Sequence, residues 1–318
     1  MFRGAGDGGA DGGADGGADG GADGGADGGA DGGALARRLS AMAHAAPVVG
    51  VAPSGGSTVV VPMGSPWIGP ERPRPDFLLL TGAEFPESRW DPALKAQRIL
   101  AEFGASGWAE KVHIDKPDNS PIALAAEVEE LISKAMLYRA IRIGEIVAQS
   151  DNLLLYWTGL LGVEAGTHPA TWELINAAMG VGHMVGLCLK EKFKRARPVQ
   201  VYPPIMPGIV TPRHPSYPNN HALQSYLISL AAMAATSVGG DPTQSPWRLP
   251  LETLADRVGE NREIAGVHFP SDTRASRQLA PQVWRILSSG KLFGELRKAA
   301  EKEWHLEWIE THRFRVPR

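Results

Sequence analysis

The sequence has a single cysteine, Cys188, so no disulfide can form within the chain. Strand-forming patterns are almost missing, and a short run at 58–62 (TVVVP) is the main one. The most apolar runs, 175–189 and 227–238, are shorter than the roughly 20 residues that a bilayer-spanning helix needs. We therefore expect a soluble protein without a membrane-spanning segment. The sequence does not specify its compartment, whether cytoplasmic, periplasmic or secreted.

A strong basic charge is also missing. Residues 1–34 carry seven Asp and one Arg, a net charge of −6, so residues 35–318 carry +3 of a total of −3. That balance is far from the basic field of a nucleic-acid-binding protein, and we expect no nucleic acid partner. The repeated Gly-Gly-Ala-Asp unit of residues 1–34 lacks the ligand spacing of known calcium loops. It also has too little apolar surface to offset the entropy of ordering, which predicts a disordered tail.

The remaining chain divides by composition. Residues 35–90 are rich in Pro, Gly and Ser, which predicts a linker with irregular wrapping. Residues 91–318 show apolar residues at helical spacing, which predicts an all-α fold in a single helical-bundle domain. The expected helices cover residues 92–104, 121–148, 170–197, 220–238, 250–266, 273–289 and 291–310.

The first polar cluster is the stretch LKEKFKRARP, residues 189–198. Lys190 and Arg197 are seven residues apart, or two helical turns, so a helix would place both on one stripe with Lys194 between them. Cations on one stripe repel each other unless an anion or a carboxylate lies among them. The stretch could be a solvated basic face or an anion site.

The second cluster is RHPSYPNNHA, residues 213–222, which precedes an apolar helical run. Asn219 is a preferred helix-capping residue, and Asn220 tolerates a left-handed backbone. The start of a helix presents free N–H groups and the positive end of the helix dipole, with His221 beside them. Either a plain cap with an incidental histidine or an anion site would fit.

The third cluster is ENREIAGVHFPSD, residues 260–272. Pro270 should interrupt the helix between His268 and Asp272, which lets the carboxylate fold back onto the imidazole. A carboxylate on one ring nitrogen fixes the tautomer and leaves the other nitrogen as a nucleophile or ligand. The alternative is a structural Arg262–Asp272 pair beside a core histidine.

Together the clusters resemble the signature of the type-2 phosphatidic acid phosphatase and vanadium haloperoxidase superfamily. The resemblance covers about residues 120–290. The matching residues, at the family's spacings, are Lys190-x6-Arg197-Pro198, Pro218-x-x-His221 and Arg262-x5-His268-x3-Asp272. The sequence departs from the family at Asn219, Asn220 and Asn261, where the family has Ser, Gly and Ser.

The resemblance implies an acid-phosphatase-like helical bundle that hydrolyses phosphomonoesters without a metal or other cofactor. It implies that His268 attacks phosphorus, that His221 is the general acid and base, and that Asp272 orients His268. The implied phosphate-binding residues are Lys190, Arg197, Arg262, Asn219 and Asn220. The expected partner is a small phosphorylated substrate, and helical bundles of this kind often form homodimers.

Two other functions share these motifs. A vanadium haloperoxidase would hold vanadate in the same pocket with His268 as its ligand, and would use hydrogen peroxide and halide. A non-catalytic relative would bind an oxyanion without turnover, because Asn219 and Asn220 replace the family residues.

Overall fold

The computed structural model describes residue 85 and residues 90–311, without the side chains of Ala93 and residues 305–311. The predicted tail at 1–34, and almost all of the predicted linker at 35–90, lie outside the described residues. Predictions about these segments stay predictions.

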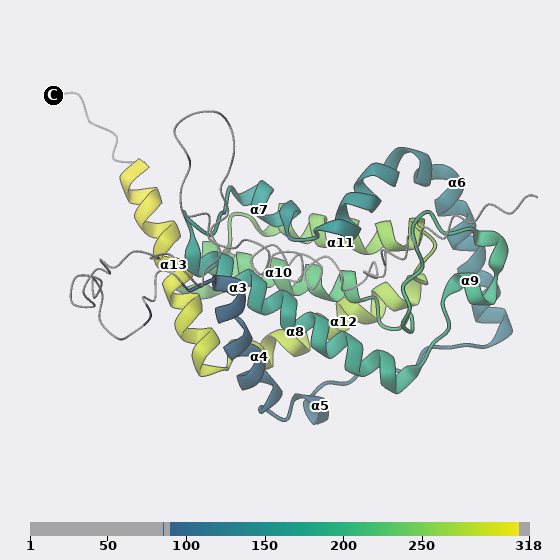
Figure 1. Ribbon diagram of the computed structural model, residues 1–318, viewed down its shortest axis with the longest axis horizontal. Coiled ribbons are helices and arrows are strands. Elements are labelled where there is room, and N and C mark those ends of the chain that lie inside the picture. The colour runs from purple at the N-terminus through teal and green to yellow at the C-terminus, as the bar shows by residue number, and fades with distance from the viewer. Residues whose placement is uncertain (1–84, 86–89, 312–318) are drawn as a thin grey trace, which may run out of the picture.

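The described residues form helices and short 3₁₀ turns without a strand, so the all-α prediction is confirmed for this part of the chain (Figure 1). In chain order the elements are α3 (Pro92–Lys95), α4 (Gln97–Gly104), α5 (Trp108–Lys111), α6 (Pro121–Asp151), α7 (Leu155–Leu161), α8 (Pro169–Phe193), α9 (Pro198–Val201), η2 (Pro203–Ile205), α10 (Asn220–Thr236), η3 (Val238–Gly240), η4 (Pro242–Gln244), α11 (Arg248–Ile264), α12 (Pro270–Ser288) and α13 (Lys291–Thr311).

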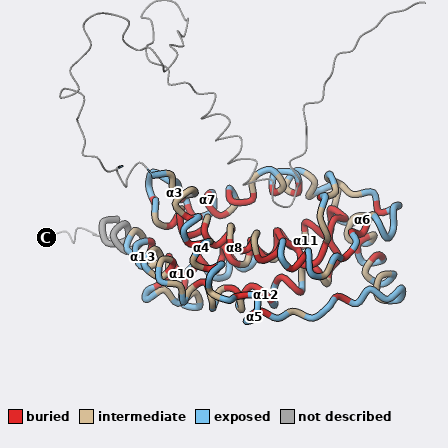
Figure 2. Tube along the Cα trace, turned by 60° about the horizontal axis from the view of Figure 1, so that its bottom comes forward, coloured by how far each residue is buried: buried red, intermediate tan, exposed pale blue. Residues whose placement is uncertain are grey.

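Helix α10 is the centre of the bundle. It packs against α8, α11, α12 and α13, and almost every one of its residues is buried (Figure 2). Its second half is rich in alanine, and fully buried alanines such as Ala231 and Ala235 let the neighbouring helices approach closely. Helix α6 lies along α11 and contacts α12, so it borders the end of the bundle where the three motifs meet (Figure 1).

Several helix boundaries differ from the sequence prediction, the predicted helix at 92–104 is divided into α3 and α4, and two of the differences bear on the motifs. Helix α8 ends at Phe193 rather than at 197, because Lys194 adopts a left-handed backbone (φ 50°) and its N–H caps the carbonyl of Lys190. The predicted cation stripe on one helix is therefore wrong. The Lys194 side chain is 68% exposed and pairs with Glu191. Helix α12 begins at Pro270, three residues earlier than predicted.

The expected lack of a membrane-spanning segment is not confirmed. Among the described residues, the helical stretch Pro169–Val201 is long and apolar enough to cross a bilayer. The same stretch contains α8, a core helix of the bundle, and 61% of its most apolar window is buried inside the protein. Length and apolarity alone do not distinguish a core helix from a membrane span.

Helices α8 and α10 meet closely where Gly186 faces Asn220. A Cβ atom built on Gly186 would lie 1.8 Å from Oδ1 of Asn220, which is far inside van der Waals contact. The amide Nδ2 of Asn220 lies 3.1 Å from Nδ1 of His183, one helical turn before Gly186 on α8. The absence of a side chain at Gly186 therefore makes room for the side chain of Asn220.

This packing predicts that Gly186→Ala lowers the free energy of unfolding by about 1–3 kcal/mol, because the added methyl group overpacks the helix contact. Gly294→Ala is the matched control: it also lies within a helix, but a Cβ there meets no atom within 4 Å. That substitution should raise the free energy of unfolding by up to about 1 kcal/mol through helix propensity. Urea unfolding followed by circular dichroism measures both values. In an Asn220→Gly background the cost of Gly186→Ala should fall; an unchanged cost would contradict the assigned contact.

Candidate active site

The pair His268–Asp272 is buried at the start of α12. Nδ1 of His268 lies 3.0 Å from Oδ2 of Asp272, and both side chains are fully buried. Pro270 occupies the first turn of α12, so His268 lies just outside the helix and Asp272 lies within its first turn. The same carboxylate oxygen accepts the backbone N–H of Phe269 at 3.0 Å. As the sequence predicted, the carboxylate folds back onto the imidazole, although by starting a helix and not by interrupting one.

The second ring nitrogen of His268 faces Arg197. Nη1 of Arg197 lies 3.0 Å from Nε2 of His268, and it also donates to the carbonyl oxygen of Val267 at 2.8 Å. A guanidinium can only donate, so Nε2 accepts and carries a lone pair. The proton of the neutral ring is then on Nδ1, where it is donated to Asp272. Arg197 and Asp272 together specify the tautomer in which Nε2 carries the lone pair.

Burial alone would raise the pKa of the Asp272 carboxyl. The hydrogen bond of His268, and the positive charge that its ring carries when protonated, act in the opposite direction, and the charge of Arg195 adds to them, so the pKa lies below its usual range. Arg195 makes this contribution through a hydrogen bond of 2.6 Å from Nη1 to Oδ1 of Asp272. Asp272 is therefore an anion at neutral pH despite its burial.

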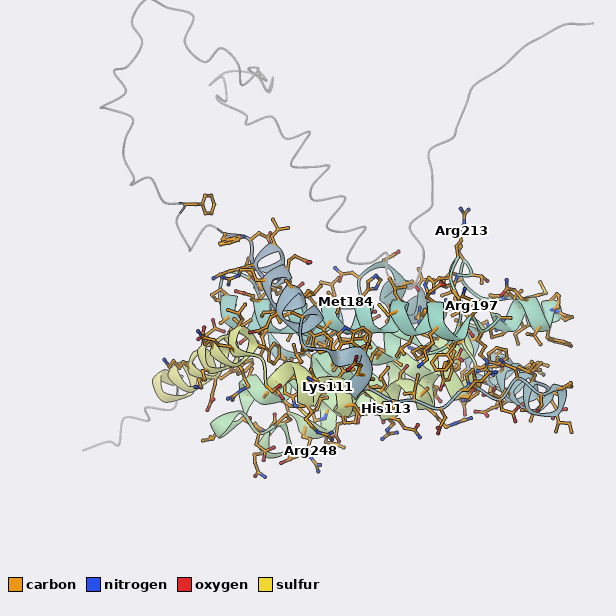
Figure 3. All side chains as sticks on the ribbon, turned by 90° about the horizontal axis from the view of Figure 1, so that it is seen from below. Lys111, His113, Met184, Arg197, Arg213 and Arg248 are labelled. Carbon is orange, nitrogen blue, oxygen red and sulfur yellow. The ribbon has the colours of Figure 1, made fainter. Side chains whose placement is uncertain are left out.

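Lys190 and Arg197 both hold the segment that precedes α10. Nζ of Lys190 donates to the carbonyl oxygens of Pro215 and Ser216 at 2.8 and 2.9 Å. Nε of Arg197 donates to the carbonyl oxygen of His214 at 2.9 Å. Both cations are buried and contact this shared segment. Arg213, which lies just before the segment, points outward from the molecule (Figure 3).

Asn219 caps α10 and ties it to α12. Its Oδ1 accepts the backbone N–H of Ala222 at 3.2 Å, and its Nδ2 donates to Oγ1 of Thr273 at 3.1 Å. The backbone N–H of Asn219 donates to the carbonyl oxygen of Asp272 at 3.1 Å. These contacts join the second and third motifs, and they place His221, which is 2% exposed, in the first turn of α10 beside them.

Two of the predicted phosphate-binding residues make their contacts with neighbouring helices. Asn220 directs its side chain to α8, as described above. Arg262 is fully buried and donates to Oγ of Ser150 at 2.6 Å and to the carbonyl oxygen of Ile146 at 2.7 Å, so its guanidinium lies against α6. Asn261, in place of the family serine, donates to Gln149 and Glu145 of α6 at 3.0 Å each. The third motif thus attaches α11 to α6.

An open cleft with a volume of about 540 Å³ lies between α6, α11 and α12, and its lining includes Pro270 and Thr273. Acids and bases in its lining form ion pairs, as in Lys134 with Glu263 and Arg142 with Glu260. Among the residues that the structure describes, no cluster of His, Cys, Asp and Glu has the arrangement of a metal site.

Sequence reasoning missed Arg195. Its position two residues before Arg197 was assigned to a continuous helix, in which it would point away from the other cations. Pro198 was the available signal, because a residue before proline avoids the helical backbone, and Arg197 is indeed extended (φ −76°, ψ 155°). His183, which belongs to none of the three motifs, is half-buried and contacts Asn220.

No family model and no curated protein matches the sequence. Among solved structures, the chain is similar to the crystal structure of a transmembrane PAP2-type phosphatidylglycerolphosphate phosphatase from Bacillus subtilis. The two share 19% sequence identity and a TM-score of 0.42, and the match covers 64% of this chain and 96% of that chain. The expectation of a soluble protein is not confirmed.

The buried cap of α10 predicts that Asn219→Ala lowers the free energy of unfolding by about 2 kcal/mol, because the variant loses the cap and the bond to Thr273. Ser120→Ala is the matched comparison, since Ser120 caps α6 in the same way at an exposed site. It should cost about 0.5–1 kcal/mol. Chemical denaturation of both variants tests the ranking, and equal losses would show that the contacts with α12 add nothing.

Proposed function

We propose that the protein is a phosphomonoester hydrolase of the type-2 phosphatidic acid phosphatase superfamily, with His268 as its nucleophile. The observation that carries the proposal is the buried chain of contacts from Arg197 through His268 to Asp272. This chain leaves a lone pair on Nε2, opposite a carboxylate that can stabilise the ring when it becomes positively charged.

In the first step, Nε2 of His268 attacks phosphorus and forms a P–N bond while the P–O bond to the leaving alcohol breaks. His221 donates a proton to the departing alkoxide, which leaves as the neutral alcohol. The imidazole becomes cationic, and Asp272 stabilises that charge through Nδ1. The Arg197 hydrogen bond to Nε2 is replaced in this step by a hydrogen bond to a phosphoryl oxygen.

In the second step, water attacks phosphorus and loses a proton to His221, which acts as a base. The P–N bond breaks, inorganic phosphate leaves, and His268 regains its lone pair while His221 regains its proton. Lys190 and Arg197 supply positive charge for the nonbridging oxygens, where the charge of the transition state is spread. Arg262, Asn219 and Asn220 belong to the proposed phosphate-binding set by their motif positions alone.

The proposed substrate is a small phosphorylated molecule, and the proposed reaction uses no cofactor. A haloperoxidase would use the same histidine to bind vanadate. The contacts described above favour neither reaction over the other, so the haloperoxidase enters as an outcome of the test.

The test uses purified full-length protein and a chromogenic phosphomonoester. Wild type should release phosphate, and His268→Ala should lose activity by several orders of magnitude, because no nucleophile remains. Wild type incubated with ³²P-labelled substrate and then denatured in alkaline detergent should carry a label that is stable in base and released by acid, and His268→Ala should lack it. His305→Ala, in the C-terminal part of α13, is the control histidine and should behave as wild type.

A separate assay supplies vanadate, hydrogen peroxide and bromide to the same proteins. Vanadate-dependent bromination without phosphatase turnover would replace the proposal by the haloperoxidase. Phosphatase turnover that survives His268→Ala would overturn the nucleophile assignment. Silence in both assays, together with phosphate binding, would identify a non-catalytic oxyanion-binding protein.

A further inference from the structure

A buried network leads from Asp272 away from His268, and it centres on Arg195. The Arg195 side chain is almost completely buried and donates to four acceptors, two in the first turn of α12, one on α6 and one just before α6. They are Oδ1 of Asp272 at 2.6 Å, Oγ of Ser271 at 2.6 Å, Oε2 of Glu127 at 2.7 Å and Oδ1 of Asn119 at 3.0 Å. The guanidinium also stacks over the ring of Phe269 at 4.1 Å.

In this arrangement the two oxygens of the Asp272 carboxylate have different partners. Oδ2 faces His268 and the backbone N–H of Phe269, and Oδ1 faces Arg195. A carboxylate held at both oxygens cannot rotate away from the imidazole. Glu127 of α6 also accepts the backbone N–H of Ser271 at 2.7 Å, so it holds both Arg195 and the first turn of α12.

We propose that Arg195 is a positioning residue for the reaction: it fixes Asp272 in the orientation and charge state that keep His268 nucleophilic, and Glu127 and Asn119 hold it there. The inference rests on the proposed function, which assigns His268 as the nucleophile. Arg195 acts only through Asp272 and does not itself touch the substrate. It is therefore distinct from Arg197, whose guanidinium faces Nε2.

The charges of Asp272, Arg195 and Glu127 determine how readily His268 takes up a second proton. Asp272 alone would attract a second proton to His268, and that proton would occupy Nε2 and abolish nucleophilicity. The positive charge of Arg195 behind Asp272 opposes this protonation, whereas the negative charge of Glu127 favours it. Among the described residues, the charged or titratable groups around Arg195, His268 and their partners include Asp272, Glu127, Asp118, Tyr217, Arg197, His214 and Arg274.

Opposite charge changes on the two partners separate a charge effect from a purely structural one. In Arg195→Gln, the acidic limb of the pH profile of kcat should move to higher pH by about one unit. The variant leaves the negative charges of Asp272 and Glu127 uncompensated near His268, and they favour protonation of its ring. In Glu127→Gln the limb should move downward, because the Arg195 charge is less compensated. Arg195→Lys keeps the charge and should restore the position of the limb, although not the full rate, because ammonium lacks the forked geometry.

The rate should fall as well. Arg195→Gln should lower kcat on the order of 100-fold with little change in KM, because the orientation of Asp272 is lost while the phosphate-binding cations are retained. Urea unfolding of each variant checks that the bundle persists. Arg274→Gln is the control: Arg274 lies 3.6 Å from Glu127 but is largely exposed, and its loss should leave both kcat and the limb unchanged.

A second readout does not depend on activity. In protein labelled with ¹⁵N-histidine, the titration of the resonance that disappears in His268→Gln should move upward in Arg195→Gln and downward in Glu127→Gln. Shifts in the same direction in both variants, or none, would overturn the role of Arg195. If wild type has no phosphatase activity but these titrations move as expected, the positioning role stands and the proposed phosphatase reaction fails.

Discussion

The carboxylate of Asp272 is the group on which the rest of this structure depends. Removing an ion of this size from water costs several kcal/mol, so it is stable inside the bundle only with good partners on both oxygens. His268, the Phe269 backbone and Arg195 supply them, and the Asp272 carbonyl accepts a further bond from Asn219. These groups come from the start of α10, the start of α12 and the segment after α8. The helix ends are thus fixed around one buried charge.

The early end of α8 makes this possible. A helix continuing to residue 197 would separate Arg195 and Arg197 by about 200° around its axis. The extended backbone after Lys194 instead lets one short segment supply two buried cations, Arg195 to Oδ1 of Asp272 and Arg197 to Nε2 of His268. The imidazole and its carboxylate are thereby enclosed between two guanidinium groups. The four side chains lie in the order Arg197, His268, Asp272 and Arg195, so the histidine–carboxylate pair has a positive charge on each side.

The sequence predicted the all-α fold, most helix positions and the His268–Asp272 contact, because helical periodicity and a histidine four residues before an aspartate are local patterns. It missed the end of α8, because a left-handed cap at a lysine has no strong sequence signal. It missed Arg195, Glu127 and the contacts of Arg262 with α6 for a different reason. Those contacts join residues more than 60 positions apart, and their pairing depends on how α6 packs against α11. No single-sequence pattern specifies that packing.

The two asparagines that depart from the family pattern have different physical roles. Asn219 is used as a cap, the role that the family serine could also fill, and its amide adds a bond to Thr273. Asn220 occupies space where the family has no side chain, and α8 accommodates it with a glycine at 186 and a hydrogen-bonding histidine at 183. The departure at Asn220 is therefore compensated on the opposing helix.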